Sequence, residues 1–171
     1  ALRKTLKKKN FFTKKIKEPN LLEFLDLVAL GTVCDVVKLI DYNRVFVKEG
    51  LDIIKRRKNL GISKIIDNSN IRFTPNSSDL GFIVGPQLNA ASRIDDSSLA
   101  SKILILENIS EIDYISKKLL LLNEKRKLIQ NTVFAEALKQ AENQKNQNFI
   151  LVYGNSWHNG VLGIVASQLI N

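Results

Sequence analysis

The chain has 171 residues, of which 44% are hydrophobic and 25% are charged, and these proportions exclude a wholly disordered protein. No apolar run approaches the roughly 18 residues needed to span a bilayer, and the first residues do not form a signal peptide, so we expect no membrane partner and a cytoplasmic location. The single cysteine, Cys34, excludes a disulfide framework and a zinc site built from several thiolates.

The net charge of +9 is concentrated at the N-terminal end, because residues 1–20 hold eight Lys or Arg and one acid, Glu18. We predict that residues 1–17 form the end of a basic helix and a short connection. Such a cluster can attract phosphate backbones through the release of counterions. Charge runs more often form a solvated helix face, and the residues alone favour that second interpretation.

The next predicted element is an apolar helix over residues 21–30, with Asn20 as its N-cap. Because nearly every residue in it is apolar, we expect it to be buried on most sides. Gly31 is expected to end this helix, and residues 33–37 are expected to form an extended turn that holds Asp35.

Four shorter helices are then predicted over residues 43–57, over residues 62–66, from Ser78 onward and over residues 99–106. Gly85 and Pro86 interrupt the third of these, and we expect them to kink or end it, since proline removes a backbone donor.

The longest predicted helix begins at Ser110, where Ser110 to Asp113 have the spacing of a capping box, and it continues to the Asn- and Gln-rich residues 143–148. At 1.5 Å per residue it is roughly 45–50 Å long. That length exceeds a small domain, so we predict a bridge between two domains, with a coiled coil as the alternative interpretation.

The end of the chain has the pattern of a buried strand over residues 149–153, a polar loop and an apolar helix. A strand-loop-helix junction in an α/β fold presents backbone N–H groups and side chains to ligands. One strand and one helix do not make a stable sheet, so we expect this unit to begin a further domain and the chain to be a fragment.

Three groups of residues are candidates for chemistry. Asp35 lies among apolar residues, and such an acid pairs with a base, caps a turn or binds a divalent metal ion. Asn89 and Arg93 are four residues apart, so on a helix they share a face that suits a phosphate; the competing interpretation pairs Arg93 with a nearby aspartate and makes Asn89 a cap. His158 and Gly160 precede the last helix, where they are placed to hold a phosphate or a base, although a lone histidine is more often structural.

These three groups, in this order, resemble the RecJ exonucleases of the DHH phosphoesterase superfamily. Residues 26–37 (DLVALGTVCDVV) resemble the family motif D-L-V-A-L-G-T-V-A-D-V-V, and residues 85–93 (GPQLNAASR) resemble G-P-R-I-N-A-A-G-R. Residues 156–169 resemble G-W-H-P-G-V-I-G-I-V-A-S-R-L. The resemblance implies an α/β protein that is mostly helical in this chain, with the end of a DHH catalytic domain at 1–108, a connector helix at 109–147 and the start of a DHH-associated α/β domain at 148–171.

The resemblance further implies a function: hydrolysis of single-stranded DNA from its 5′ end, in recombination and repair, with two Mn²⁺ or Mg²⁺ ions. It makes Asp35 a catalytic metal ligand, Asn89 and Arg93 contacts to the DNA strand, and His158 and Gly160 part of the second domain that closes over the substrate.

The chain also departs from the family pattern. The D-H-H triplet that supplies most metal ligands is absent from these residues, and Gln87 replaces the usual arginine, which weakens an expected DNA contact. We therefore expect the chain alone to be inactive and to need the N-terminal part, which a separate chain would supply. Two alternatives stay open: a non-catalytic nucleic-acid-binding remnant of a split gene, and a DHH phosphoesterase acting on short oligonucleotides or cyclic dinucleotides.

Overall fold

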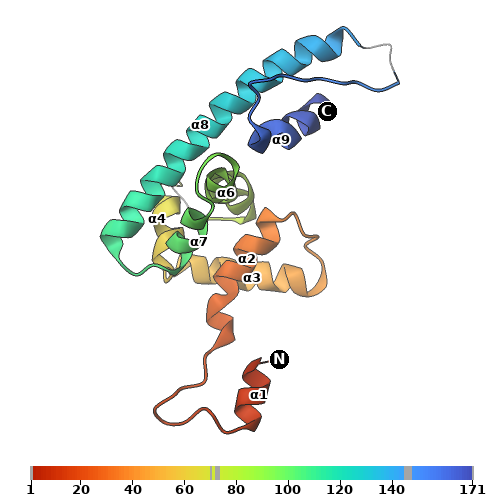
Figure 1. Cartoon of the computed structure of the whole chain (residues 1–171). Helices are drawn as coiled ribbons and strands as arrows, with labels where there is room; N and C mark the ends of the chain where they lie inside the picture. The colour runs from red at the N-terminus through yellow and green to blue at the C-terminus, as the bar shows by residue number, and fades with distance from the viewer. Residues whose placement is uncertain (1, 70, 72–73, 145–147, 171) are drawn as a thin grey trace.

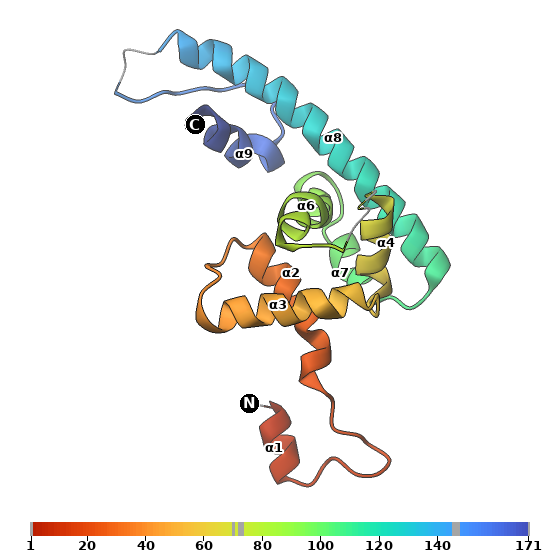
Figure 2. The same ribbon diagram turned by 180° about the vertical axis from the view of Figure 1, so that it is seen from behind.

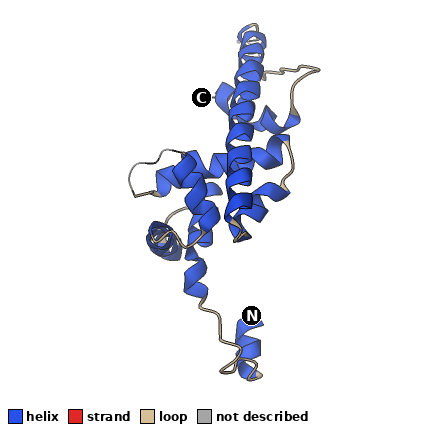
Figure 3. Cartoon of the chain, turned by 90° about the vertical axis from the view of Figure 1, so that its left-hand side faces the viewer, coloured by secondary structure: helices blue, strands red, loops and turns tan. Residues whose placement is uncertain are grey.

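A computed structural model describes residues 2–69, 71, 74–144 and 148–170. All regular elements in these ranges are helical, and no strand occurs in them (Figure 3), which confirms the prediction of a mostly helical chain. The elements in chain order are α1 (Leu2–Lys8), η1 (Leu21–Phe24), α2 (Leu25–Cys34), α3 (Asp41–Lys55), α4 (Leu60–Asn68), α5 (Ser77–Asp79), η2 (Leu80–Val84), α6 (Gly85–Ile94), α7 (Ser98–Ile105), α8 (Ile109–Glu142) and α9 (Asn159–Ile170). In the part described, no helix combines the length and the apolar character that crossing a membrane requires.

The larger hydrophobic core joins α2, α3, α4, α6 and α7 to the first half of α8 (Figures 1 and 2). Asparagine side chains fix where several of these helices begin, because an N-cap side chain accepts from the otherwise unpaired N–H groups of the first turn. Asn20 accepts from Leu22 N at 3.2 Å and confirms the predicted cap, and Asn59 accepts from Ile62 N at 2.9 Å.

Helix α8 has 34 residues and is about 50 Å long, which agrees with the length predicted from the sequence. It begins one residue before Ser110, because Asn108, not the predicted capping box, accepts from Glu111 N at 3.1 Å. Its first half packs into the main core, whereas Val133 and Ala137 in its second half pack on α9 in a separate cluster. The helices that α8 contacts are short ones, which argues against a coiled coil.

Residues 77–94 form one continuous helical run, so the expectation that Gly85 and Pro86 end the helix is wrong. The turn before Pro86, η2, is a π-helix, and Gly85 N–H donates to Leu80 O five residues back. The wider turn accommodates the proline, which has no N–H to offer and whose ring would crowd the carbonyl four residues earlier.

Helix α2 differs from its prediction in two ways. It continues through Gly31 to Cys34, and only one of its sides is buried: Ala29 and Leu30 lie in the core, whereas Val28 is exposed, as is Leu22 in the preceding η1. The described residues pack against one side of this apolar segment, and the other side stays exposed. The apolar composition alone therefore predicted more burial than the structure shows.

The strand predicted for residues 149–153 is not formed. Two glutamines at the end of α8 take the place of a partner strand. Gln144, two residues beyond the last residue of α8, pairs through its amide with both the N–H (3.0 Å) and the C=O (2.8 Å) of Leu151. One turn earlier, Gln140 pairs in the same way with Tyr153, at 3.0 Å and 2.8 Å. The backbone is therefore tied to α8 along one edge, and within the described residues no second strand lies along the other.

Candidate functional site

One face of α6, which carries the second motif, contacts residues of both the first and the third motif. Gly85, Asn89 and Arg93 are four residues apart and lie along the same side of the helix, over about 12 Å. At one end Gly85 lies against α2, where a Cβ on it would be 2.6 Å from Cys34 Sγ. At the other end Arg93 contacts α9, and the exposed Asn89 lies between the two contacts.

Asp35 is the C-cap residue of α2, next to the cysteine that touches Gly85. Its backbone N–H donates to Gly31 O at 3.0 Å, and its side chain is exposed. Within the described ranges its carboxylate makes no ion pair or hydrogen bond, so it neither pairs with a base nor caps a turn through its side chain. It is a free carboxylate on the residue that follows the cysteine in contact with Gly85.

The turn that follows Asp35 holds a β-branched residue in a strained conformation. Val36 has φ 54° and occupies the left-handed position of a Schellman motif, with Val36 N donating to Val33 O at 3.1 Å and Val37 N to Thr32 O at 3.0 Å. Glycine is usual at this position because other residues lose about 1–2 kcal/mol there. The hydrogen bonds of the motif hold the strain next to Asp35.

Replacing Val36 with glycine is expected to stabilise the chain by about 1 kcal/mol, since the side chain is exposed and only strain is removed. Urea unfolding measures the change. Val37→Gly is the control, because Val37 does not have a positive φ. It should lower the free energy of unfolding, and a loss of stability in Val36→Gly of the same size would contradict the strain.

The thiol of Cys34 is partly buried against η2. Burial raises its pKa, and the neighbouring Asp35 raises it further, so the thiol stays protonated and points at Leu80 O at 3.9 Å. Across the ranges that the structure covers, no group of three His, Cys, Asp or Glu side chains could hold a metal ion. Asp35 fits the chemistry of one hard oxygen ligand for Mn²⁺ or Mg²⁺, and further ligands would have to come from outside these residues.

The contact between α6 and α9 is built around Gly160. Arg93 donates from a guanidinium nitrogen to Gly160 O at 2.9 Å, and a Cβ on Gly160 would be 2.1 Å from Arg93 O. Only glycine permits this approach. His158 Nδ1 accepts from Gly160 N–H at 3.1 Å, so the histidine caps the start of α9, and in the neutral ring its Nε2 is left as a donor. The structure thus brings Arg93, His158 and Gly160 together.

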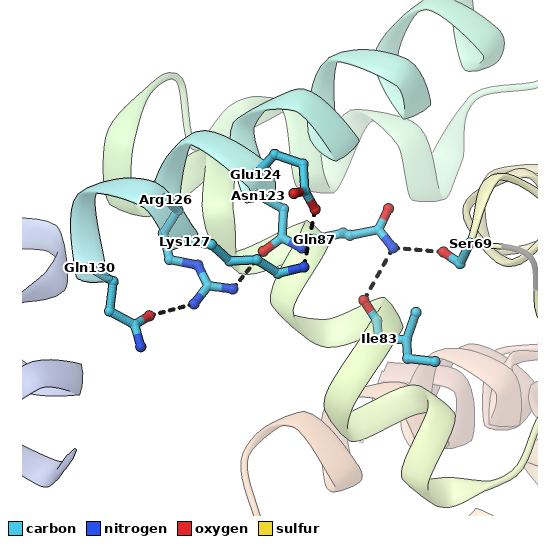
Figure 4. Close-up of polar contacts among 8 residues, drawn as sticks. All are labelled: Ser69, Ile83, Gln87, Asn123, Glu124, Arg126, Lys127 and Gln130. Atoms are coloured by element: carbon cyan, nitrogen blue, oxygen red, sulfur yellow. Dashed lines mark hydrogen bonds and ion pairs between the residues drawn. The ribbon is translucent and has the colours of Figure 1, made fainter. Parts of the chain in front are cut away.

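Arg126 on α8 belongs to the same junction, and sequence reasoning missed it. Its guanidinium donates to Asn123 Oδ1 at 2.7 Å and to Gln130 Oε1 at 2.6 Å (Figure 4), and Gln130 in turn donates to Gln168 of α9 at 3.0 Å. Desolvation, and then the nearby charge of Arg93, lower the pKa of Arg126. The sequence did contain a signal for it: Asn123 and Gln130 lie three residues before and four residues after Arg126, so in a helix both amides are within reach of its guanidinium.

Neither guanidinium of this junction has a carboxylate partner in the described part of the chain. Arg93 and Arg126 are held by a backbone carbonyl and by buried amides, which are neutral acceptors. Partly buried positive charge without compensation is costly and attracts an anion. The junction of α6, α8 and α9 therefore suits a phosphate group.

Gln87 lies in the core and not beside Asn89 on the exposed face. Its Nε2 donates to Ser69 Oγ at 2.7 Å and to Ile83 O at 3.2 Å (Figure 4), and it is 2% exposed. Its Oε1 is buried without a hydrogen-bond partner. Glutamine at this position thus serves packing, and it offers no group to a strand at the surface.

No family model matches the chain. The chain is 41% identical to the single-stranded-DNA-specific exonuclease RecJ of Salmonella typhimurium, over 99% of this chain and 31% of that protein. The Escherichia coli protein of the same name is 40% identical over the same shares. The chain spans about a third of the length of these relatives.

Solved structures give the same result. RecJ of Thermus thermophilus in complex with Mn²⁺ superposes with a TM-score of 0.82 at 31% identity, covering 89% of this chain and 23% of that one. An exonuclease RecJ bound to manganese superposes with a TM-score of 0.82 at 30% identity, covering 92% of this chain and 40% of that one. The fold of the described helices is thus that of one part of these proteins.

Proposed function

We propose that this chain, which is homologous over nearly its whole length to one part of the RecJ exonucleases, contributes that part to a metal-dependent exonuclease acting on single-stranded DNA. The observation that supports this most directly is the face of α6, which runs from the C-terminus of α2 beside Asp35 to the Arg93 contact with α9. Residues from all three resembling motifs meet along that one line.

The proposed division into domains follows the two hydrophobic clusters. Residues 1–108 form the end of the catalytic domain, residues 109–147 the connector, and residues 148–171 the start of the second domain. Two hydrophobic clusters support this division: the main core, and the smaller cluster in which Val133 and Ala137 of α8 pack on Val161 and Val165 of α9. Helix α8 contributes to both. A bridge of 34 residues suits an enzyme that encloses a strand better than one that acts on cyclic dinucleotides.

Mn²⁺ or Mg²⁺ is the proposed cofactor, since the matching T. thermophilus structures contain these ions. Two such ions would activate water and stabilise the leaving oxygen. Asp35 holds a metal ion through its free carboxylate, together with ligands from outside the chain. Asn89 and Arg93 bind the strand that passes along α6, and Arg126 adds positive charge at its far end. His158 orients the start of α9 through Nδ1 and leaves Nε2 available to the substrate.

The direction of hydrolysis, from the 5′ end, and the role in recombination and repair are parts of the same proposal, as is a cytoplasmic location. The chain alone is proposed to be inactive, because one carboxylate cannot hold two ions. A separate chain carrying the N-terminal part would complete it.

A chimera tests the proposal. In it, this chain replaces the matching third of E. coli RecJ, and a labelled single strand is incubated with the chimera and Mn²⁺. We expect mononucleotides to be released from the 5′ end by the chimera, and none by the 171-residue chain alone or by the relative without its matching third. Release from the 3′ end, or cleavage by the chain alone, would contradict the proposal.

A further inference from the structure

The N-terminal residues 2–18 form a separate structural feature, which we call the basic arm. It consists of α1, a turn and the segment that returns to Glu18, and it extends away from the helical body (Figures 1 and 3). Helix α1 contains no buried residue. The arm is therefore a surface that the core does not require.

The arm is closed by its only acid. Glu18 pairs with Arg3 at 2.7 Å and with Lys7 at 3.1 Å, and the Lys7 hydrogen bond is the main cause of the lowered pKa of Glu18. These contacts join the two ends of the arm and hold the intervening residues as a loop.

The backbone of the loop is fixed by two local motifs. Asn10, with φ 51°, ends α1 in a Schellman motif in which Phe11 N donates to Leu6 O at 3.0 Å. Thr13 Oγ1 then accepts from Lys15 N at 3.2 Å and from Ile16 N at 3.1 Å. The ring of Phe11 is held edge-on to Phe12 at 5.7 Å, and Phe11 remains 48% exposed.

Glu18 compensates only part of the arm's charge. Six lysines of the arm are exposed and have no ion pair with a described residue: Lys4, Lys8, Lys9, Lys14, Lys15 and Lys17. Most of them flank the turn that presents Phe11. The arm thus carries an exposed aromatic side chain together with several exposed lysines that have no ion pair with described residues.

We propose that the basic arm binds single-stranded DNA, with its lysines on the phosphates and an unstacked base on Phe11. This proposal rests on the proposed function, and it adds a binding surface separate from the face of α6. Lysines next to an exposed aromatic ring are the arrangement that binds single strands, because unpaired bases are free to stack. An anionic membrane is a poorer match, since α1 has seven residues and only two of them, Leu2 and Leu6, are apolar.

Fluorescence anisotropy of a labelled single strand, with the 171-residue chain, tests the proposal. Substituting Lys8, Lys9, Lys14 and Lys15 by alanine is expected to weaken binding roughly 100-fold at about 0.1 M salt and to reduce the slope of log K against log salt by about 3. The matched control substitutes four exposed lysines elsewhere that form no ion pair with described residues: Lys48, Lys102, Lys125 and Lys139. It should change the affinity less than threefold.

Two further measurements decide between binding modes. Phe11→Ala is expected to weaken single-strand binding about tenfold. Equal losses in the two lysine sets would overturn the proposal, and so would equal affinity for duplex and single strand, or arm-dependent binding to anionic lipid vesicles without binding to the strand. Circular dichroism checks that each variant keeps its helices. Nuclease activity is not measured, so failure here is distinct from failure of the chimera.

Discussion

Replacing Asp35 with asparagine in the chimera is expected to reduce the rate of single-strand hydrolysis on the order of 10³-fold. Asparagine keeps the size of the side chain and removes the negative charge that a divalent ion needs, and changes even in the outer shell of a metal site cost 10–100-fold. Because Asp35 is exposed and its side chain makes no hydrogen bond or ion pair with described residues, the substitution should leave the stability of the protein unchanged. Release of mononucleotides under single-turnover conditions measures the effect.

Two controls separate metal binding from other roles of Asp35. Affinity for the single strand, measured with Ca²⁺ to prevent cleavage, should stay within about twofold of the parent. Glu49→Gln, the same charge change at another exposed carboxylate, should keep full activity. A rate within tenfold of the parent in Asp35→Asn would remove Asp35 from the metal site.

The sequence predicted the helices well where periodicity and caps agree. Helix α8 has the expected length, and Asn20 is the expected cap, because both depend on local interactions. The predicted strand at 149–153 failed for a different reason. A strand depends on a partner, and here the amides of Gln140 and Gln144 provide the pairing instead.

For the candidate site, the sequence predicted which residues share a helix face but not what that face contacts. Asn89 and Arg93 share a face of α6, as their spacing indicates. That this face touches Cys34 at one end and Gly160 at the other depends on tertiary packing, which no spacing reveals. Arg126 was missed because its importance comes from burial and from the absence of an acid near it.

The same packing explains how the two ends of the site are coupled. Two contacts set the position of α9: its residues Val161 and Val165 pack against α8, and its residue Gly160 contacts α6. A movement of α9 would therefore break the hydrogen bond between Arg93 and Gly160 O. The contacts of α9 with α6 and α8 therefore fix where His158 lies relative to Arg93.

Replacing Gly160 with alanine is expected to destabilise the packing of α9 by about 2–3 kcal/mol. The new Cβ would lie 2.1 Å from Arg93 O, and a backbone atom cannot move aside as a flexible side chain does. Moving α9 away would expose Val161 and Val165, which are 0% and 2% exposed, and would break the Arg93 hydrogen bond. Urea unfolding measures the loss, and hydrogen exchange should show it mainly in the amides of α9 while those of α3 and α4 stay protected.

Gly163→Ala is the matched control, because it lies in the same helix and a Cβ there would meet nothing within 4 Å. It should stabilise the chain by about 0.5–1 kcal/mol, since alanine favours the helix more than glycine does. The two substitutions add the same methyl group three residues apart, so opposite signs can come only from the contact with α6. Equal stability of the two variants would show that α9 is not held on α6 through Gly160, and the coupling of His158 to Arg93 would then lose its structural basis.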